Sequence, residues 1–142
     1  MRYVIMTLLL GLGIAVGESH YNAIDLEGFE YESPAVELDS VRITYYEPLP
    51  WQCQGNPLIT ANGSHIDTVA LRKKEIHWCA VSRDIEAIYP MGSEIEVFIS
   101  EGHRWNGTWK IMDRTSARLT KTIDILSNTD KGGCYRGKVR GV

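Results

Sequence analysis

The chain has 142 residues, of which 18 are acidic and 15 are lysine or arginine, and its formal net charge is −3. This length suits one compact domain that is large enough to bury a core of its own. Nucleic-acid binding requires concentrated positive charge, whereas the short basic run Arg72-Lys73-Lys74 is followed by Glu75 and is predicted to be a solvated loop. We therefore do not expect nucleic acid to be a partner.

The N-terminal segment has the pattern of a secretory signal peptide. Arg2 precedes an uncharged and mostly aliphatic run from Val4 to Val16, and Ala15 and Gly17 are small residues at a suitable cleavage point. The run is shorter than the roughly 20 apolar residues of a transmembrane helix. We predict a signal peptide over residues 1–17, export to the periplasm, cell envelope or medium, and no stable membrane insertion after cleavage. The remaining 125 residues lack Arg2 and carry a formal charge of −4.

The rest of the chain is predicted to form an arm followed by an all-β domain. Residues 18–40 are acidic and aperiodic, which indicates an extended arm, and the domain is expected over residues 41–142. Only residues 82–88 suggest a short helix, with Ser82 as its cap. Many short strands and little helix are typical of a barrel or sandwich. Six β-rich runs are separated by turn signals: 41–46, 76–81, 94–100, 108–112, 122–126 and 135–139.

Two turn signals have a second interpretation. Asn62-Gly63-Ser64 and Asn106-Gly107-Thr108 both fit the acceptor pattern for N-glycosylation, and both also suit β-turns. In a bacterial or phage product they would be turns only.

Two aspartates lie eleven residues apart near the C-terminal end. Asp113 follows the strand-like run 108–112, and Asp124 lies within Ile123-Asp124-Ile125. Side chains alternate between the two faces of a strand, so if the isoleucines belong to the core, Asp124 faces away from it. Either aspartate also suits a plain structural role, because an aspartate at a strand end often accepts backbone N–H bonds in the next turn.

Further landmarks precede this pair in a recognisable order. Thr60-Ala61-Asn62-Gly63 is followed by a small-residue strand that ends at Ser82, by Asp84, and by Pro90-Met91-Gly92. With Asp113 and Asp124, this ordered set resembles the three-aspartate (3D) and rare-lipoprotein-A-like group of cell-wall glycan enzymes and their relatives. The resemblance covers roughly residues 41–139.

The resemblance implies a fold, a substrate and a set of site residues. The fold would be a six-stranded double-psi β-barrel with at most one or two short helices, and the substrate peptidoglycan or a related glycan. Asp124 would be the acid/base of a lytic transglycosylase, and Asp113 the neighbour that raises its pKa and contacts the sugar. Thr60, Gly63 and Asp84 would line the groove. No cofactor is implied, and a monomer is expected.

The chain also departs from these patterns. Ser64 and Ser82 stand where the rare-lipoprotein-A pattern has an acid and a histidine, and residues 114–120 lack the glycines that follow the first aspartate in the three-aspartate enzymes. Two functions therefore remain open: a murein-cleaving enzyme, and a non-catalytic barrel that binds glycan or a protein partner. An aspartic protease is disfavoured because Asp113 is followed by Arg114-Thr115 rather than by a small hydroxyl residue and glycine.

Aromatic and metal-binding residue types complete the sequence-based expectations. Flat aromatic faces suit sugar rings, and we place Trp51 and Trp105 at the groove because both lie beside turn residues. The four histidines show no metal-ligand spacing, so no metal is expected.

The chain has three cysteines, which allow at most one bridge within the chain. Cys79 lies in an apolar strand and is expected to be buried, so a disulfide between Cys53 and Cys134 is favoured. No motif places an activating base beside a cysteine, so cysteine catalysis is not expected.

Overall fold

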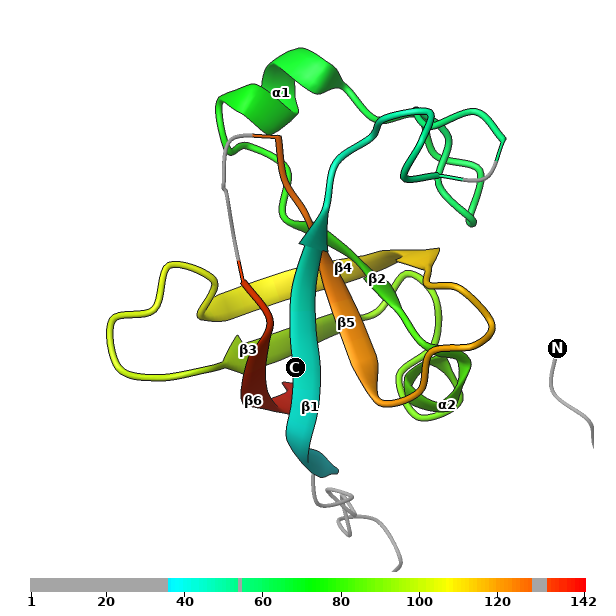
Figure 1. Cartoon of the computed structure of the whole chain (residues 1–142). Helices are drawn as coiled ribbons and strands as arrows, with labels where there is room; N and C mark the ends of the chain where they lie inside the picture. The colour runs from blue at the N-terminus through cyan, green and yellow to red at the C-terminus, as the bar shows by residue number, and fades with distance from the viewer. Residues whose placement is uncertain (1–35, 54, 129–132) are drawn as a thin grey trace, which may run out of the picture. The chain divides into compact units, whose positions relative to one another are not determined.

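The computed structural model describes residues 36–53, 55–128 and 133–142, and Figure 1 shows their arrangement. The predicted signal peptide and most of the predicted arm lie outside these residues. No helix in the described ranges is long and apolar enough to cross a bilayer. The elements in chain order are β1 (Glu37–Tyr46), α1 (Thr68–Arg72), β2 (Trp78–Val81), α2 (Arg83–Glu86), β3 (Glu94–Phe98), β4 (Gly107–Arg114), β5 (Thr122–Leu126) and β6 (Tyr135–Gly141).

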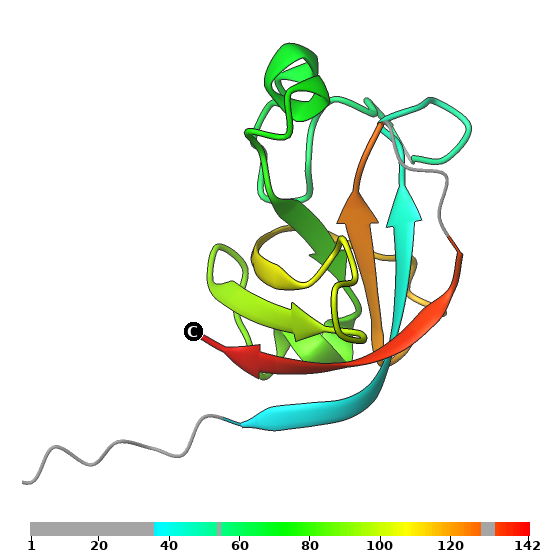
Figure 2. The same cartoon turned by 90° about the vertical axis from the view of Figure 1, so that its left-hand side faces the viewer.

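The six strands close into one barrel. Around the barrel the strands follow the order β1-β5-β2-β4-β3-β6, and β6 pairs with β1 to complete the circle. The pairs β1/β5 and β2/β4 are parallel and the other four pairs are antiparallel. Figures 1 and 2 show β1 between β5 and β6 from two directions. The predicted all-β, six-stranded closed barrel with two short helices is confirmed.

The strand order has an internal twofold relation. Exchanging β1 with β4, β2 with β5, and β3 with β6 leaves every neighbour and every strand direction unchanged. Each parallel pair thus joins a strand of one half of the chain to a strand of the other. The consequence for the site is that β2 is inserted between β5, which carries Asp124, and β4, which carries Asp113.

Alternation along the strands decides which side chains enter the barrel. Ile123 and Ile125 of β5 are fully buried, as are Val41 and Ile43 of β1. The residues between them are therefore on the outer surface of the barrel wall. A second, smaller cluster of Ile66, Leu71 and Leu126 covers part of that outer surface next to α1.

β1 begins earlier than the sequence indicated. Glu37 and Leu38 pair with Arg140 and Val139 of β6, so the barrel starts four residues before the predicted boundary at residue 41. A register shift between Leu38 and Val41 separates the two parts of the ladder. The polar composition of residues 37–40 hid this part of the strand, because it is an exposed extension.

The two helices differ in how they begin. The predicted helix at 82–88 forms as α2, but Ser82 makes no side-chain cap bond and its buried Oγ instead accepts the N–H of Thr122 at 3.0 Å. The unpredicted α1 begins at Asp67, whose carboxylate accepts the N–H groups of Val69 and Ala70. Because of α1, Arg72 is the last residue of a helix rather than part of a loop.

Candidate functional site

The candidate site is a row of four side chains across four neighbouring strands, which we call the carboxylate row. Its members are Thr44 on β1, Asp124 on β5, Ala80 on β2 and Asp113 on β4. Paired residues lie on the same face of a sheet, and the buried neighbours of Asp124 place this face outside the barrel. Adjacent strands are about 4.8 Å apart, so the two aspartate Cα atoms are about 10 Å apart.

A β-bulge in β4 brings Asp113 into the row. The register of β2 with β4 shifts between Cys79 and Ala80, so that Ile111 lies opposite Cys79 but Asp113, not Met112, lies opposite Ala80. Bulges re-aim side chains in this way and are common near functional sites. Without the extra residue, Asp113 and Asp124 would not both lie opposite Ala80.

Asp124, like Asp113, is half-buried. Burial raises the pKa of its carboxyl, the negative charge of Asp113 raises it further, and the positive charge of Arg42 opposes both. The hydroxyl of Thr44 donates to its Oδ1. Asp124 therefore has the property that a general acid requires, a pKa above that of an exposed aspartate.

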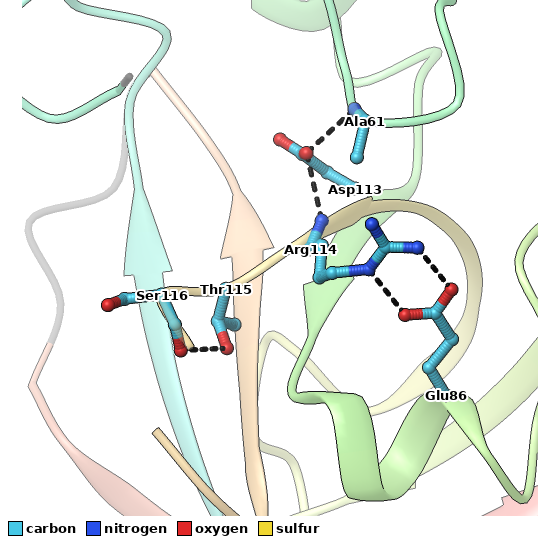
Figure 3. Close-up of polar contacts among 6 residues, drawn as sticks. All are labelled: Ala61, Glu86, Asp113, Arg114, Thr115 and Ser116. Atoms are coloured by element: carbon cyan, nitrogen blue, oxygen red, sulfur yellow. Dashed lines mark hydrogen bonds and ion pairs between the residues drawn. The ribbon is translucent and has the colours of Figure 1, made fainter. Parts of the chain in front are cut away.

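Asp113 is held by three donors. Its Oδ1 accepts the N–H groups of Ala61 and Arg114, both at 2.8 Å, as Figure 3 shows. Its Oδ2 accepts the hydroxyl of Tyr46 at 3.0 Å. The structural role that the sequence left open is thus present, because Asp113 joins the turn at Ala61 to β4.

Tyr46 is a site residue that the sequence analysis did not identify. Burial raises its pKa, as do the charge of Asp113 and the hydrogen bond to it, so the phenol remains a donor. Its ring packs against the outer cluster of Ile66, Leu71 and Leu126. A strand prediction alone does not reveal this residue, since the contact requires β1 and β4 to approach in space.

Arg114 forms an ion pair with Glu86 of α2 and not with Asp113. Its guanidinium makes two contacts to the Glu86 carboxylate, at 2.5 and 2.6 Å, and Figure 3 shows it turned toward α2. The ion pair between Arg114 and Glu86 links α2 to the end of β4. Only the backbone N–H of Arg114 faces Asp113.

Asp84 lies in the first turn of α2. Its exposed carboxylate accepts the N–H of Lys121 at 2.8 Å. Burial alone would raise its pKa, but hydrogen bonds from Ser82, Lys121 and nearby backbone N–H groups outweigh burial and lower it. These contacts fix the turn before β5 and join Asp84 to neither Asp113 nor Asp124 within the described residues.

Thr60 and Gly63 belong to the turn that presents Ala61 to Asp113. The hydroxyl of Thr60 is 2.6 Å from Oδ1 of Asn62, and Gly63 has a φ of +85°. The N–H of Asn62 donates to the carbonyl of Met112, the bulge residue. The turn therefore positions the carboxylate row, and the family-based expectation that it contacts sugar stays a prediction.

The two tryptophans expected at the groove have opposite environments. Trp51 is 78% exposed on the loop after β1. Trp105 is 1% exposed and packs in the barrel core against Tyr45 and Tyr135, so its expected role as an open sugar platform is wrong. The turn residues beside Trp105 correctly indicated a loop. They did not indicate that the Trp105 side chain is buried in the barrel core.

Two surface hollows lie on the part of the chain that the structure describes. One of about 160 Å³ is lined by His77, Trp105 and Trp109 among others, and another of about 310 Å³ lies over Glu96, Phe98 and Lys138. Neither is lined by Asp113 or Asp124. Within the row itself, Thr44, Asp113 and Asp124 are half-buried and Ala80 is buried.

The expected Cys53–Cys134 disulfide is not formed. All three cysteines are free: Cys79 is buried as expected, Cys134 is exposed, and the thiol of Cys53 lies 3.6 Å from the carbonyl oxygen of Glu47. Burial raises the pKa of Cys53, and the charge of Asp113 adds to this. No cluster of metal-binding side chains occurs within the ranges that the structure describes.

Comparison with known proteins adds no assignment. No protein-family model matches the chain, and no curated protein sequence matches it. The chemistry of the carboxylate row is therefore the basis on which a function is assigned.

Proposed function

We propose that the protein is exported and cleaves peptidoglycan glycan strands as a lytic transglycosylase, with Asp124 as its acid/base. One observation carries this proposal: Asp124 is a half-buried carboxyl whose pKa is raised, and it shares one face and one neighbour, Ala80, with the carboxylate of Asp113. A pair of carboxyls in different environments is the usual arrangement for glycosidic bond cleavage.

The proposed reaction needs one proton-transferring carboxyl. Protonated Asp124 gives its proton to the glycosidic oxygen as the bond from that oxygen to the anomeric carbon breaks. The 6-hydroxyl of the same sugar then bonds to the anomeric carbon and passes its proton to the Asp124 carboxylate, which restores the acid. The product is a 1,6-anhydro sugar, and no water is consumed.

Asp113 would act by its charge. It raises the pKa of Asp124, and a fixed carboxylate also stabilises the positive charge that develops on the anomeric carbon. Its three hydrogen bonds to Ala61, Arg114 and Tyr46 hold it in one position for this purpose. Trp51, exposed on the loop after β1, is a candidate contact for a neighbouring sugar.

The test is mass spectrometry of purified peptidoglycan after incubation with residues 18–142, compared with Asp124→Asn and Asp84→Asn. Native protein should release anhydro-muropeptides, and Asp124→Asn should reduce the rate by about 10²–10⁴-fold. Asp84→Asn is the matched control, since it removes a carboxylate that does not belong to the row. Products with reducing ends would show hydrolysis instead, and equal release by native protein and Asp124→Asn would remove Asp124 from the mechanism.

A binding function is the second candidate, and a specific observation favours it. Asp113 is fully engaged by three donors, and Ser82 uses its hydroxyl to hold Thr122 rather than to face the row. A scaffold with these features can bind glycan without cutting it. Retention of the protein on insoluble peptidoglycan with no released products would support this function over cleavage.

A further inference from the structure

Two arginines lie directly opposite each other beside the carboxylate row. Arg42 of β1 pairs with Arg136 of β6, and on its other side with Thr122 of β5. Both arginines are exposed, and residues in register share a face, so both side chains extend from the outer wall with Cβ atoms about 5 Å apart. Figures 1 and 2 show that these strands run side by side.

The arginine pair differs from the other cations of β6. Lys138 forms ion pairs with Glu37 and Asp39, and Arg140 forms one with Glu96. Among the described residues, Arg42 and Arg136 form no ion pair with an acid, and Arg136 donates only to the backbone oxygen of Ser40 at 3.1 Å. Like charges directly opposite each other destabilise a sheet. A bound anion would relieve this repulsion.

The pair is also close enough to the row to serve the same ligand. Arg42 is one strand away from Asp124 and two residues before Thr44, and its charge acts on the Asp124 carboxyl. A ligand lying across β5 and β1 would therefore meet Asp124 and the arginine pair together. Arginine binds carboxylates through two parallel N–H···O bonds, which makes a carboxylate the expected anion.

We propose that Arg42 and Arg136 form a subsite for a carboxylate of the glycan substrate, next to the acid/base. This inference depends on the proposed function for the identity of the glycan, and it adds that the strand recognised is anionic. The carboxylate belongs either to the sugar itself, as the lactyl group of peptide-free glycan, or to an attached peptide. An anion bound here also neutralises the positive charge of Arg42, which favours the ionised form of Asp124.

The experiment measures dissociation constants by calorimetry with Asp124→Asn protein, which binds without cutting. The probes are peptide-free oligosaccharides from peptidoglycan and muropeptides that keep their peptides, each used with free and with amidated carboxylates. The free form of one probe should bind about tenfold or more tightly than its amidated form, as a charge-assisted hydrogen bond implies. The probe that shows this difference identifies the source of the carboxylate.

Substitutions then locate the subsite. Arg42→Gln and Arg136→Gln, each added to Asp124→Asn, should remove the preference for the free carboxylate, while Arg140→Gln should keep it because Arg140 is already paired with Glu96. The subsite would be overturned if both probes bound equally tightly in their free and amidated forms, or if neither probe bound. It would also be overturned if Arg140→Gln reduced the preference for the free carboxylate as much as Arg42→Gln and Arg136→Gln do. A preserved preference in a protein that releases no products would refute cleavage and leave the subsite standing.

Discussion

Asp113 and Asp124 are chemically identical side chains that the barrel places in different surroundings. Both are half-buried, but Asp113 receives three hydrogen bonds, whereas Asp124 receives one from Thr44. Burial and the charge of Asp113 raise the pKa of Asp124, against the opposing charge of Arg42. The different roles proposed for the two aspartates therefore rest on their surroundings and not on residue type.

Replacing Asp124 by asparagine should reveal this environment in the stability of the fold. Because the pKa of Asp124 is higher in the folded protein than in the unfolded chain, its stabilising contribution is fully present below about pH 4 and is lost as pH rises through the folded pKa. Asparagine buries no charge and still accepts the hydroxyl of Thr44. We expect Asp124→Asn to be at least as stable as native protein at pH 7, with the difference disappearing toward pH 3.

Urea denaturation at pH 3, 5 and 7 checks this expectation, with Asp84→Asn as a control of opposite sign. The pKa of Asp84 is lowered in the folded state, so its contribution is present at neutral pH and is lost as pH falls through the folded pKa. Asp84→Asn should therefore be destabilised most at pH 7. A clear loss of stability in Asp124→Asn at pH 7 would mean that the fold needs the ionised carboxylate.

Tyr46→Phe should weaken the positioning of Asp113. Its hydroxyl donates to Oδ2 of Asp113 at 3.0 Å, so removing it leaves that carboxylate with two donors instead of three. We expect the maximum rate of glycan cleavage to fall about tenfold, with a stability loss of about 1–3 kcal/mol. Tyr45→Phe is the control, because the Tyr45 hydroxyl makes no hydrogen bond within the described residues. An unchanged rate per folded molecule in Tyr46→Phe would limit Tyr46 to packing.

At the scale of elements, a turn and a bulge together form the row. The turn at residues 60–64 presents the N–H of Ala61, and the bulge at Met112 brings Asp113 to the outer face. Gly63 holds this turn with a φ of +85°, a conformation that costs other residues about 1–2 kcal/mol. Nothing lies within 4 Å of a methyl group added there, so the cost would come from backbone strain alone.

Gly63→Ala should therefore weaken both the fold and the site, whereas Gly102→Ala should weaken only the fold. Gly102 has a φ of +70° and equally open surroundings, in the turn after β3, and it contacts no member of the row. We expect both variants to lose about 1 kcal/mol in urea denaturation, and only Gly63→Ala to lose glycan cleavage beyond its loss of folded protein. If both variants cleaved glycan equally well per folded molecule, the turn at Gly63 would have no role in cleavage.

The strands were predictable because β-branched residues and turn signals are local properties of the sequence. All six predicted runs overlap observed strands, since alternation such as Ile123-Asp124-Ile125 needs no knowledge of the partner strand. The helix α1 was missed because its five residues depend on the cap at Asp67 and on the burial of Leu71. The bulge and the contact of Tyr46 with Asp113 are pairing effects, so no single segment carries a sign of them.

At the scale of the whole molecule, the twofold relation of the strands explains why the row has its present form. Exchanging the two halves carries Thr44 onto Asp113 and Asp124 onto Ala80, so the four positions are two equivalent pairs. The topology thus creates two equivalent places for an acid on β2 and β5, and this chain uses only the one on β5. The equivalent place on β2 is occupied by Ala80, which is buried and has no ionisable group.

Closure of the barrel makes every strand either a part of the carboxylate row or a neighbour of it. Among the described glycines, Gly137 of β6 has the least room for an added methyl group. A methyl group there would lie 2.6 Å from Cδ1 of Ile43 and 2.6 Å from the backbone oxygen of Phe98. The isoleucine can change rotamer, but the Phe98 oxygen belongs to β3, which is paired with β6. We expect Gly137→Ala to cost about 1–3 kcal/mol through overpacking, whereas Gly141→Ala meets only the Tyr89 ring at 3.3 Å and should cost less.

Urea denaturation followed by both tryptophan fluorescence and far-ultraviolet circular dichroism measures these losses and their cooperativity. Because β6 joins β1 to β3, strain at Gly137 should lower the midpoint seen by both probes equally, as two-state unfolding of a closed barrel requires. The buried Trp105 and Trp109 report on the core, and the dichroism reports on the strands. Separated transitions would therefore mean that the barrel does not unfold as one unit, as expected if β6 opens first. In that case Arg42 on β1 and Arg136 on β6 would not be held at a fixed separation. A single coincident transition would instead indicate that this surface is preformed for a ligand.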